Sequence, residues 1–200
     1  MAQSQINQVY FGPVKVKLSE RTAAVRVLDG VLDQIERQWP GIYQAVDGVL
    51  RERHQPTIDP PKAKFQFTLA AIAINLRATF DVFPLEIAKR LMKYTMFVFE
   101  SHFPDPKMFQ LITDSVDRYI KAWNDGLLRI ENPAKKVSAH LYYNMGLRNI
   151  THTVGDRKYK APDLVVIDYL SQVLVLFGGK WEAIDMKYEL EEFPEGTINS

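Results

Sequence analysis

Apolar and polar residues alternate near both ends of the chain. Residues 14–18 alternate apolar side chains with Lys15 and Lys17, and residues 184–190 alternate apolar side chains with Asp185, Lys187 and Glu189, a mainly acidic set. A two-residue period is typical of a half-buried β-strand. Opposite charges that face each other across a strand pair attract by roughly a few tenths of a kcal/mol. We therefore expect the two terminal strands to pair and to tie the ends of the domain together.

Between these segments the apolar residues recur every three or four positions, which is the period of an amphipathic helix. Ser19 is a suitable N-cap for the first helix, and Pro40 is expected to interrupt that helix. The prolines within residues 54–61 predict a loop. Further helices are predicted over residues 64–83, 84–99, 107–130 and 133–150.

The segment 151–177 gives weaker signals. Gly155-Asp156 lies in a polar stretch and indicates a hairpin turn. Residues 164–177 are almost entirely apolar and rich in β-branched side chains, so strand competes with helix there. We predict a helix, because the run is long and because Gly178-Gly179 suits a helix C-terminus.

These elements predict a mainly α fold. We expect a single-domain multi-helix bundle with about six or seven helices and a small β element formed by the N- and C-terminal segments. The 200 residues are enough to bury a hydrophobic core without metals or disulfides. The single helical domain is predicted to span residues 1–200, with a flexible N-terminal segment at 1–12 and a flexible C-terminal tail at 193–200.

Composition narrows the function classes. The chain has no cysteine, which excludes disulfides, thiolate metal sites and a cysteine nucleophile. The net charge is only +1, so no global field attracts nucleic acid or an anionic membrane. The N-terminus resembles no secretory signal, and the apolar runs 65–76 and 164–177 are interpreted as core helices rather than membrane spans. A cytoplasmic location is expected.

No familiar catalytic signature is present. The sequence lacks glycine-rich phosphate loops, the His-Glu-x-x-His pair and the Gly-x-Ser-x-Gly elbow. Glu100, His102 and Asp105 form the tightest carboxylate–histidine group, but residues two apart on a helix do not share a face, so we interpret them as a polar helix end. The carboxylates of residues 29–36 are interpreted as a solvated, salt-bridged helix face. We assign no catalytic residue, metal or cofactor, and the sequence leans away from an enzyme without deciding the question.

The region 133–160 is the most informative. It holds six basic side chains and one acidic one, a net charge of +5. Polar or basic residues recur every four positions between 136 and 152, which in a continuous helix would form one ridge with tyrosines interleaved. Single-stranded nucleic acid needs cationic donors for its phosphates and planar rings for its bases. The candidate macromolecule-binding residues are Lys136, His140, Tyr143, Asn144, Arg148, His152, Arg157 and Lys158.

Two observations argue against a nucleic-acid-binding role for this region. A solvated helix face with Val137, Leu141 and Met145 as its inward stripe explains the same residues. The segment from Asp163 onward has a net charge of −6 and could neutralise the basic region, either within one chain or between subunits. Contact between subunits would produce head-to-tail association that weakens in high salt.

The favoured function is therefore a non-catalytic interaction or regulatory protein that binds another macromolecule through a charged and aromatic helix face. Its partner would be another protein or a second copy of the chain. The first alternative is a nucleic-acid-associated protein that uses the basic ridge at 136–160. The second is an enzyme or sensor with a buried apolar small-molecule pocket, suggested by Met92, Met96 and Met108 near two phenylalanines.

Overall fold

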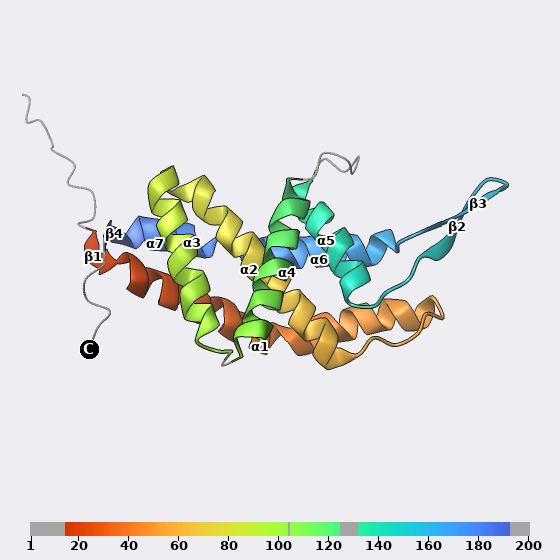
Figure 1. The fold of residues 1–200 in the computed structure, drawn as a ribbon. Coiled ribbons are helices and arrows are strands. Elements are labelled where there is room, and N and C mark those ends of the chain that lie inside the picture. The colour runs from red at the N-terminus through yellow and green to blue at the C-terminus, as the bar shows by residue number, and fades with distance from the viewer. Residues whose placement is uncertain (1–14, 104, 125–131, 193–200) are drawn as a thin grey trace, which may run out of the picture.

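The computed structural model describes residues 15–103, 105–124 and 132–192. Within them, the helices and strands follow one another along an elongated molecule (Figure 1). Their order is β1 (Val16–Ser19), α1 (Glu20–Glu52), α2 (Pro60–Val82), α3 (Leu85–Glu100), α4 (Pro106–Trp123), α5 (Pro133–Asn144), β2 (Ile150–Val154), β3 (Arg157–Ala161), α6 (Leu164–Val175), α7 (Lys180–Lys187) and β4 (Tyr188–Glu191). The predicted mainly α fold with a β element made from both ends is confirmed.

Helix α2 forms the centre of the hydrophobic core. It packs against all six other helices, which is why apolar residues occur on nearly every side of it. One polar group also lies inside this core. The buried Asn75 amide donates to the Phe177 carbonyl at 2.9 Å, and the Trp181 indole N–H donates to the Asn75 side-chain oxygen at 3.0 Å. These bonds satisfy the buried polar atoms and fix the α6–α7 turn against α2.

The two ends of the chain meet as predicted. Strands β1 and β4 pair in parallel with Val16 opposite Tyr188, and the charges pair as well. The Lys15 ammonium lies 3.2 Å from the Asp185 carboxylate, and Lys17 pairs with Glu191. The predicted extent of the second strand is wrong, however, because residues 184–187 belong to α7. A helix there buries both Trp181 and Ile184, whereas a strand would not place them on one side.

A buried ion pair lies beside this terminal sheet. Ser19 caps α1, as predicted, by accepting a hydrogen bond from the Thr22 N–H at 3.1 Å. Glu20 follows in the first turn, and only 1% of its side chain is exposed. The Arg90 guanidinium of α3 donates to both Glu20 oxygens, at 2.8 and 2.7 Å, so that α3 is held against the start of α1.

Helix α1 contradicts the predicted break at Pro40. It continues through the proline for 33 residues. Proline removes one backbone hydrogen bond, at a cost of about 3 kcal/mol. Buried side chains on both sides of it, including Ile35, Trp39, Ile42 and Val46, form one continuous stripe that offsets this cost.

Other boundaries are corrected more modestly. The loop after α1 ends earlier than predicted, because Asp59 caps α2 and Pro60 and Pro61 occupy its first turn. Helix α4 ends at Trp123 with Asn124 as its C-cap, earlier than predicted, and residues 125–130 of the predicted helix lie outside the described residues. The predicted flexible ends, 1–12 and 193–200, also lie outside them.

The apolar segment at 164–177 is helical, as predicted. By length and composition alone, Leu164–Lys187 would be long and apolar enough to cross a membrane. In the structure, α6 and α7 are separated by a turn, and the inner side of α6 packs against α5 and α2. Packing in the helical core accounts for this inner side, whereas Leu164, Val165 and Val175 are exposed. The expected absence of a membrane span stays a prediction.

Candidate functional site

The predicted ridge does not follow a single helix. Helix α5 begins after the Asn132 cap and ends at Asn144, where Gly146 adopts a left-handed φ of 90°. A glycine takes this conformation without the steric penalty that a side chain would bring. The prediction of a helix to residue 150 is therefore wrong, and the chain leaves α5 to form a hairpin.

The candidate residues on α5 have different environments. Lys136 is half-buried and His140 is exposed. Asn144 has a structural role, because its amide donates to the Tyr119 hydroxyl at 2.9 Å, which in turn donates to the Gln66 side chain at 3.0 Å. Burial raises the pKa of Tyr119 to about 12, so the ring stays neutral at physiological pH.

Two tyrosines in the last turn of α5 hold the segment that leads to the hairpin. The buried Tyr142 hydroxyl donates to the Arg148 carbonyl at 2.6 Å, and the exposed Tyr143 hydroxyl donates to the Asn149 side chain at 2.8 Å. Burial raises the pKa of Tyr142. These bonds fix the direction in which β2 leaves the helical body, while the Arg148 side chain stays in solvent.

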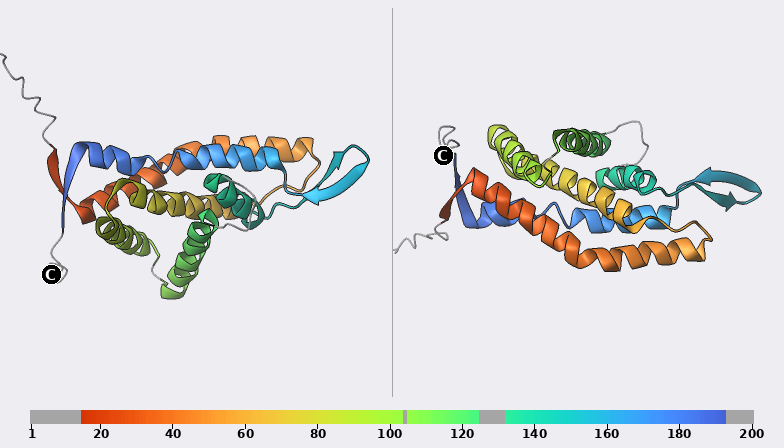
Figure 2. Two further views of the ribbon diagram at one scale, coloured as in Figure 1. Left: turned by 90° about the horizontal axis from the view of Figure 1, so that it is seen from above. Right: turned by 60° about the horizontal axis from the view of Figure 1, so that its bottom comes forward.

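Strands β2 and β3 form an antiparallel hairpin that projects beyond the helices (Figures 1 and 2). Its turn is made by Gly155 with φ of 58° and by Asp156, as the sequence indicated. Most of its side chains are exposed on both faces. No other element packs extensively against it in the part of the chain that the structure describes. We call this element the hairpin arm (150–161).

The register divides the arm into two chemically different faces. Pairing of His152 with Tyr159 puts these rings on one face, where they stack with centroids 5.3 Å apart and planes 15° apart. The His152 Nε2 atom lies 3.1 Å from the Pro162 carbonyl, which anchors this stack to the base of the arm. Tyr159 is 48% exposed, so ring surface remains open to solvent.

The opposite face of the arm is polar and cationic. Because side chains alternate along a strand, the threonines of β2 and the lysines of β3 share this face. It comprises Thr151, Thr153, Lys158 and Lys160. Neither lysine makes an ion pair with any described residue, and the same holds for Arg148 and Arg157. The arm therefore presents uncompensated positive charge.

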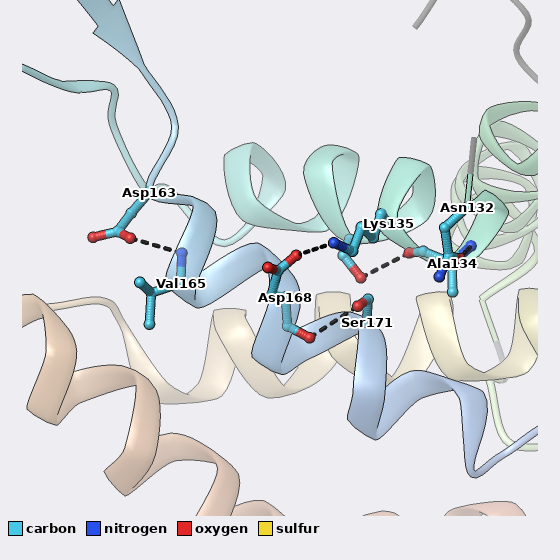
Figure 3. Close-up of polar contacts among 8 residues, drawn as sticks. Asn132, Ala134, Lys135, Asp163, Val165, Asp168 and Ser171 are labelled. Carbon is cyan, nitrogen blue, oxygen red and sulfur yellow. Dashed lines mark hydrogen bonds and ion pairs between the residues drawn. The ribbon is translucent and has the colours of Figure 1, made fainter. Parts of the chain in front are cut away.

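The acidic C-terminal segment does not neutralise the arm within one chain. Residues 182–192 lie at the opposite end of the molecule (Figures 1 and 2), where they pair with Lys15, Lys17 and Arg90. Only the start of the segment meets the basic region. Asp168 of α6 accepts from Lys135 of α5 at 2.7 Å (Figure 3), which neutralises a lysine that lies outside the arm.

A pocket of about 350 Å³ lies where the arm joins the helices. It is lined by Arg53, Ile150, Thr151, His152, Thr153, Asp163, Leu164 and Val165. Asp163 caps α6 through one oxygen, which accepts from the Val165 N–H at 3.0 Å (Figure 3). Its Oδ2 atom points away from that bond and has no hydrogen-bond partner, although the side chain is only 2% exposed. The Arg53 Nε atom approaches Oδ2 at 3.7 Å, longer than a hydrogen bond.

Sequence reasoning missed this pocket. Asp163 before an apolar run is a recognisable N-cap signal, but a cap alone indicates no ligand. Its partner Arg53 lies at the far end of α1, and no spacing rule connects the two.

The other candidate clusters have structural explanations. The His102 Nδ1 atom lies 3.1 Å from the Val98 carbonyl at the end of α3, and Asp105 caps α4 by accepting from the Lys107 N–H. On the first helix, Glu36 pairs with Lys64. No group of three metal-ligating side chains occurs among the described residues.

An apolar cleft of about 350 Å³ lies beside the α6–α7 turn. It is lined by Ile74, Ala78, Asp81, Val82, Trp123, Val175, Gly178, Gly179 and Glu182. None of the three methionines that suggested a buried ligand pocket belongs to it. Met92 and Met96 instead pack against the core, as ordinary filling residues do.

Comparison with protein-family models, with curated proteins and with solved structures found no match.

Proposed function

We propose that this protein is a non-catalytic, cytoplasmic binding protein that holds single-stranded nucleic acid with its hairpin arm. The observation that carries the proposal is the two-faced arm, which has on one side lysines that make no ion pair with a described residue and on the other the His152–Tyr159 stack. Phosphates are bound by flexible ammonium groups and threonine hydroxyls, whereas unstacked bases lie on aromatic rings. The lysines and the stacked rings lie on opposite faces of one thin ribbon, and the register places a further cation, Arg157, on the ring face.

The packing of the arm supports the same proposal. A two-stranded hairpin exposed on both faces adds little to the hydrophobic core, because it buries little apolar surface. A single strand that wraps the ribbon would cover both faces and meet cationic and aromatic groups in turn. If β2 and β3 served only to connect α5 to α6, they would need neither to project beyond the helices nor to carry exposed lysines.

The experiment compares two double variants. Lys158→Ala/Lys160→Ala removes two cations from the arm, and Lys107→Ala/Lys121→Ala removes two exposed lysines of α4 that also lack ion pairs among the described residues. Binding of a labelled single strand is measured by fluorescence anisotropy between roughly 50 and 200 mM salt. The arm variant is expected to bind about tenfold more weakly, with a salt slope reduced by about 1.4, because each phosphate contact contributes roughly 0.7 on single strands.

A second pair of variants separates stacking from charge. Tyr159→Ala is expected to weaken binding by about 1 to 3 kcal/mol, while Tyr159→Phe keeps the ring and should bind as the parent does. Equal binding by the arm and α4 variants would contradict the proposal. Tighter binding of a duplex than of a single strand would point to a ribbon that enters the major groove instead.

Head-to-tail self-association is the second candidate, favoured by the position of the charges. The segment 182–192 and the basic arm lie at opposite ends of the molecule (Figure 1). Three carboxylates of that segment already pair with Lys15, Lys17 and Arg90, so the candidate rests on the exposed Glu182 and Glu189, which make no ion pair with a described residue and would meet the arm of the next copy. Such contacts weaken as salt screens them. Sedimentation at low and high salt tests this candidate, and a mass that does not change with salt counts against it.

A further inference from the structure

The pocket at the base of the arm contains an incomplete set of polar contacts. Burial of a carboxylate oxygen without a hydrogen-bond partner costs roughly 1 to 3 kcal/mol, and more for a charged group. The Asp163 Oδ2 atom is in this position, and it lines the same pocket as the Arg53 side chain, 52% of which is exposed. The oxygen itself is almost fully covered, so it becomes an acceptor for a ligand in the pocket when a neighbouring side chain such as Arg53 shifts aside.

The two charges limit what that ligand can be. A metal or ammonium cation would be repelled by the Arg53 guanidinium, whose Nε atom lies 3.7 Å from Oδ2. A phosphate or carboxylate would be repelled by Asp163 itself. A neutral group with a donor and an acceptor side by side suits both residues, because its N–H would bind Oδ2 while its carbonyl accepts from Arg53.

Nucleobases and peptide groups both carry such an edge, and the location of the pocket favours a base. His152 and the strand residues Thr151 and Thr153 belong to both the pocket and the arm. A strand bound along the arm would therefore pass the mouth of the pocket. At about 350 Å³, the pocket lies within the range of small-ligand sites, roughly 300 to 1,000 Å³.

We infer that this pocket binds one unstacked guanine base of the strand, which Asp163 and Arg53 recognise through its Watson–Crick edge. Guanine presents a carbonyl next to two N–H donors, so it supplies the acceptor for Arg53 and a pair of donors for the carboxylate. Thymine presents a single donor between two carbonyls. Adenine presents one amino donor beside a ring-nitrogen acceptor. Cytosine presents one amino donor beside two acceptors, a ring nitrogen and a carbonyl, so neither base offers two adjacent donors. The inference rests on the proposed function, and it adds sequence preference to binding that the arm alone would not discriminate.

Asp163→Asn is the sharpest variant. Asparagine is as good an N-cap as aspartate, so its oxygen can still accept from the Val165 N–H. The atom at the Oδ2 position becomes an NH₂ donor, which opposes the donors of guanine. Asp105→Asn is the matched control. Asp105 caps α4 in the same way, by accepting from the N–H two residues ahead, and it does not line the pocket at the base of the arm.

The binding assay uses the full chain and three oligo(dT) strands of about 12 nucleotides, within the usual site size for such proteins. One strand is all thymine, one carries a single guanine, and one carries inosine, which lacks the 2-amino group, at that position. The guanine strand is expected to bind roughly tenfold more tightly than the thymine strand, with inosine between them. Asp163→Asn should abolish this preference and Asp105→Asn should keep it. A preference that survives Asp163→Asn would overturn the inference.

Titration with free guanosine, followed by amide NMR signals, separates this inference from the proposed function. Guanosine should shift the signals of residues 151–153 and 164–165 whether or not long strands bind. If all three strands bind equally and guanosine shifts nothing, the pocket inference fails while strand binding by the arm stands. If no strand binds, the proposed function fails, and the guanosine shifts alone decide the pocket. Equal shifts with a blocked dipeptide, which offers the same N–H and carbonyl edge, would overturn the choice of a nucleobase in favour of a peptide.

Discussion

The two ends of the molecule each carry a pair of short strands with lysines, and they use those lysines differently. At the terminal sheet, Lys15 and Lys17 face acidic partners, and the strands join the two ends of the chain to the helical core. On the hairpin arm, Lys158 and Lys160 have no acidic partner among the described residues, and the strands pair only with each other. The same residue type is thus paired with carboxylates of the same chain at one end and available to a partner at the other.

The difference shows why a regional charge count alone was ambiguous. The sequence has a basic region followed by an acidic one, and the two could have cancelled each other. The chain instead runs back along the body through α6 and α7, which carries the acidic segment to the far end of the molecule (Figure 2). Local pairing at Lys135 and Asp168 neutralises part of the basic region and leaves the arm unchanged.

The largest effect that we expect is a contrast between two deletions. Loss of β1 should destabilise the fold, whereas loss of the hairpin arm should abolish binding and leave stability nearly unchanged. Deletion of residues 1–18 removes β1, including the buried Leu18, and should lower the free energy of unfolding by about 4 kcal/mol or more. Replacement of Thr151–Lys160 by Asn-Gly closes the hairpin early and should leave the melting temperature nearly unchanged while binding to single strands is lost. Thermal melts and the anisotropy assay check both outcomes.

A shorter deletion of residues 1–14 is the control for the first variant, since it keeps β1 and the Ser19 cap. The difference between the two deletions isolates the contribution of β1. If the longer deletion melts with the shorter one, the terminal sheet does not tie the fold together.

The next largest effect concerns the ion pair beside the terminal sheet. Glu20→Gln leaves the Arg90 guanidinium without its buried carboxylate and should destabilise the protein by about 2 to 3 kcal/mol, because Arg90 itself stays partly solvated. Chemical denaturation measures this loss. Glu36→Gln is the matched control, since its partner Lys64 pairs with a largely exposed carboxylate, and it should change stability by less than about 0.5 kcal/mol. Similar losses from both variants would mean that burial of Glu20 has little energetic importance.

The smallest effect is expected at an exposed pair of the terminal sheet. The hydrogen bond to Glu191 raises the pKa of Lys17, so the pair contributes stability below the ordinary lysine pKa of 10.5 and loses it as pH rises through the folded value. Lys17→Ala should lower the melting temperature by at most about 2 °C near neutral pH, and by nothing at strongly alkaline pH. Lys187→Ala, at an exposed lysine without an ion pair among the described residues, provides the baseline. A loss that persists unchanged above the folded pKa would rule out the ion pair as its cause.

Local signals in the sequence predicted most of the helices and the caps. Ser19 and Pro84 marked helix starts, and the amphipathic period of α4 located its buried face. The predictions were wrong where a tertiary contact overrides a local preference. Pro40 does not end α1, because buried residues on both sides of it share one core. Similarly, alternation at 184–187 suggested a strand, but burial of Trp181 against α2 favours a helix.

For the candidate site, too, the sequence identified the residue types, while their contacts depended on the tertiary structure. Composition identified the basic and aromatic residues of 148–160, because an excess of cations is a property of the sequence itself. It could not decide that Asn144 is bound to Tyr119, or that the ridge ends at Gly146 and continues as a hairpin.

The sequence by itself determined a mainly helical chain with complementary charges near its two ends and with an excess of basic residues at 133–160. These properties depend on residue type and on spacing over a few positions, which local physics can evaluate. Only the tertiary structure decided that the basic region projects as an arm, that the acidic segment lies at the opposite end, and that Arg53 meets Asp163. Those outcomes depend on how helices far apart in the chain pack around α2, since the burial of their apolar faces outweighs the local preferences of the segments between them.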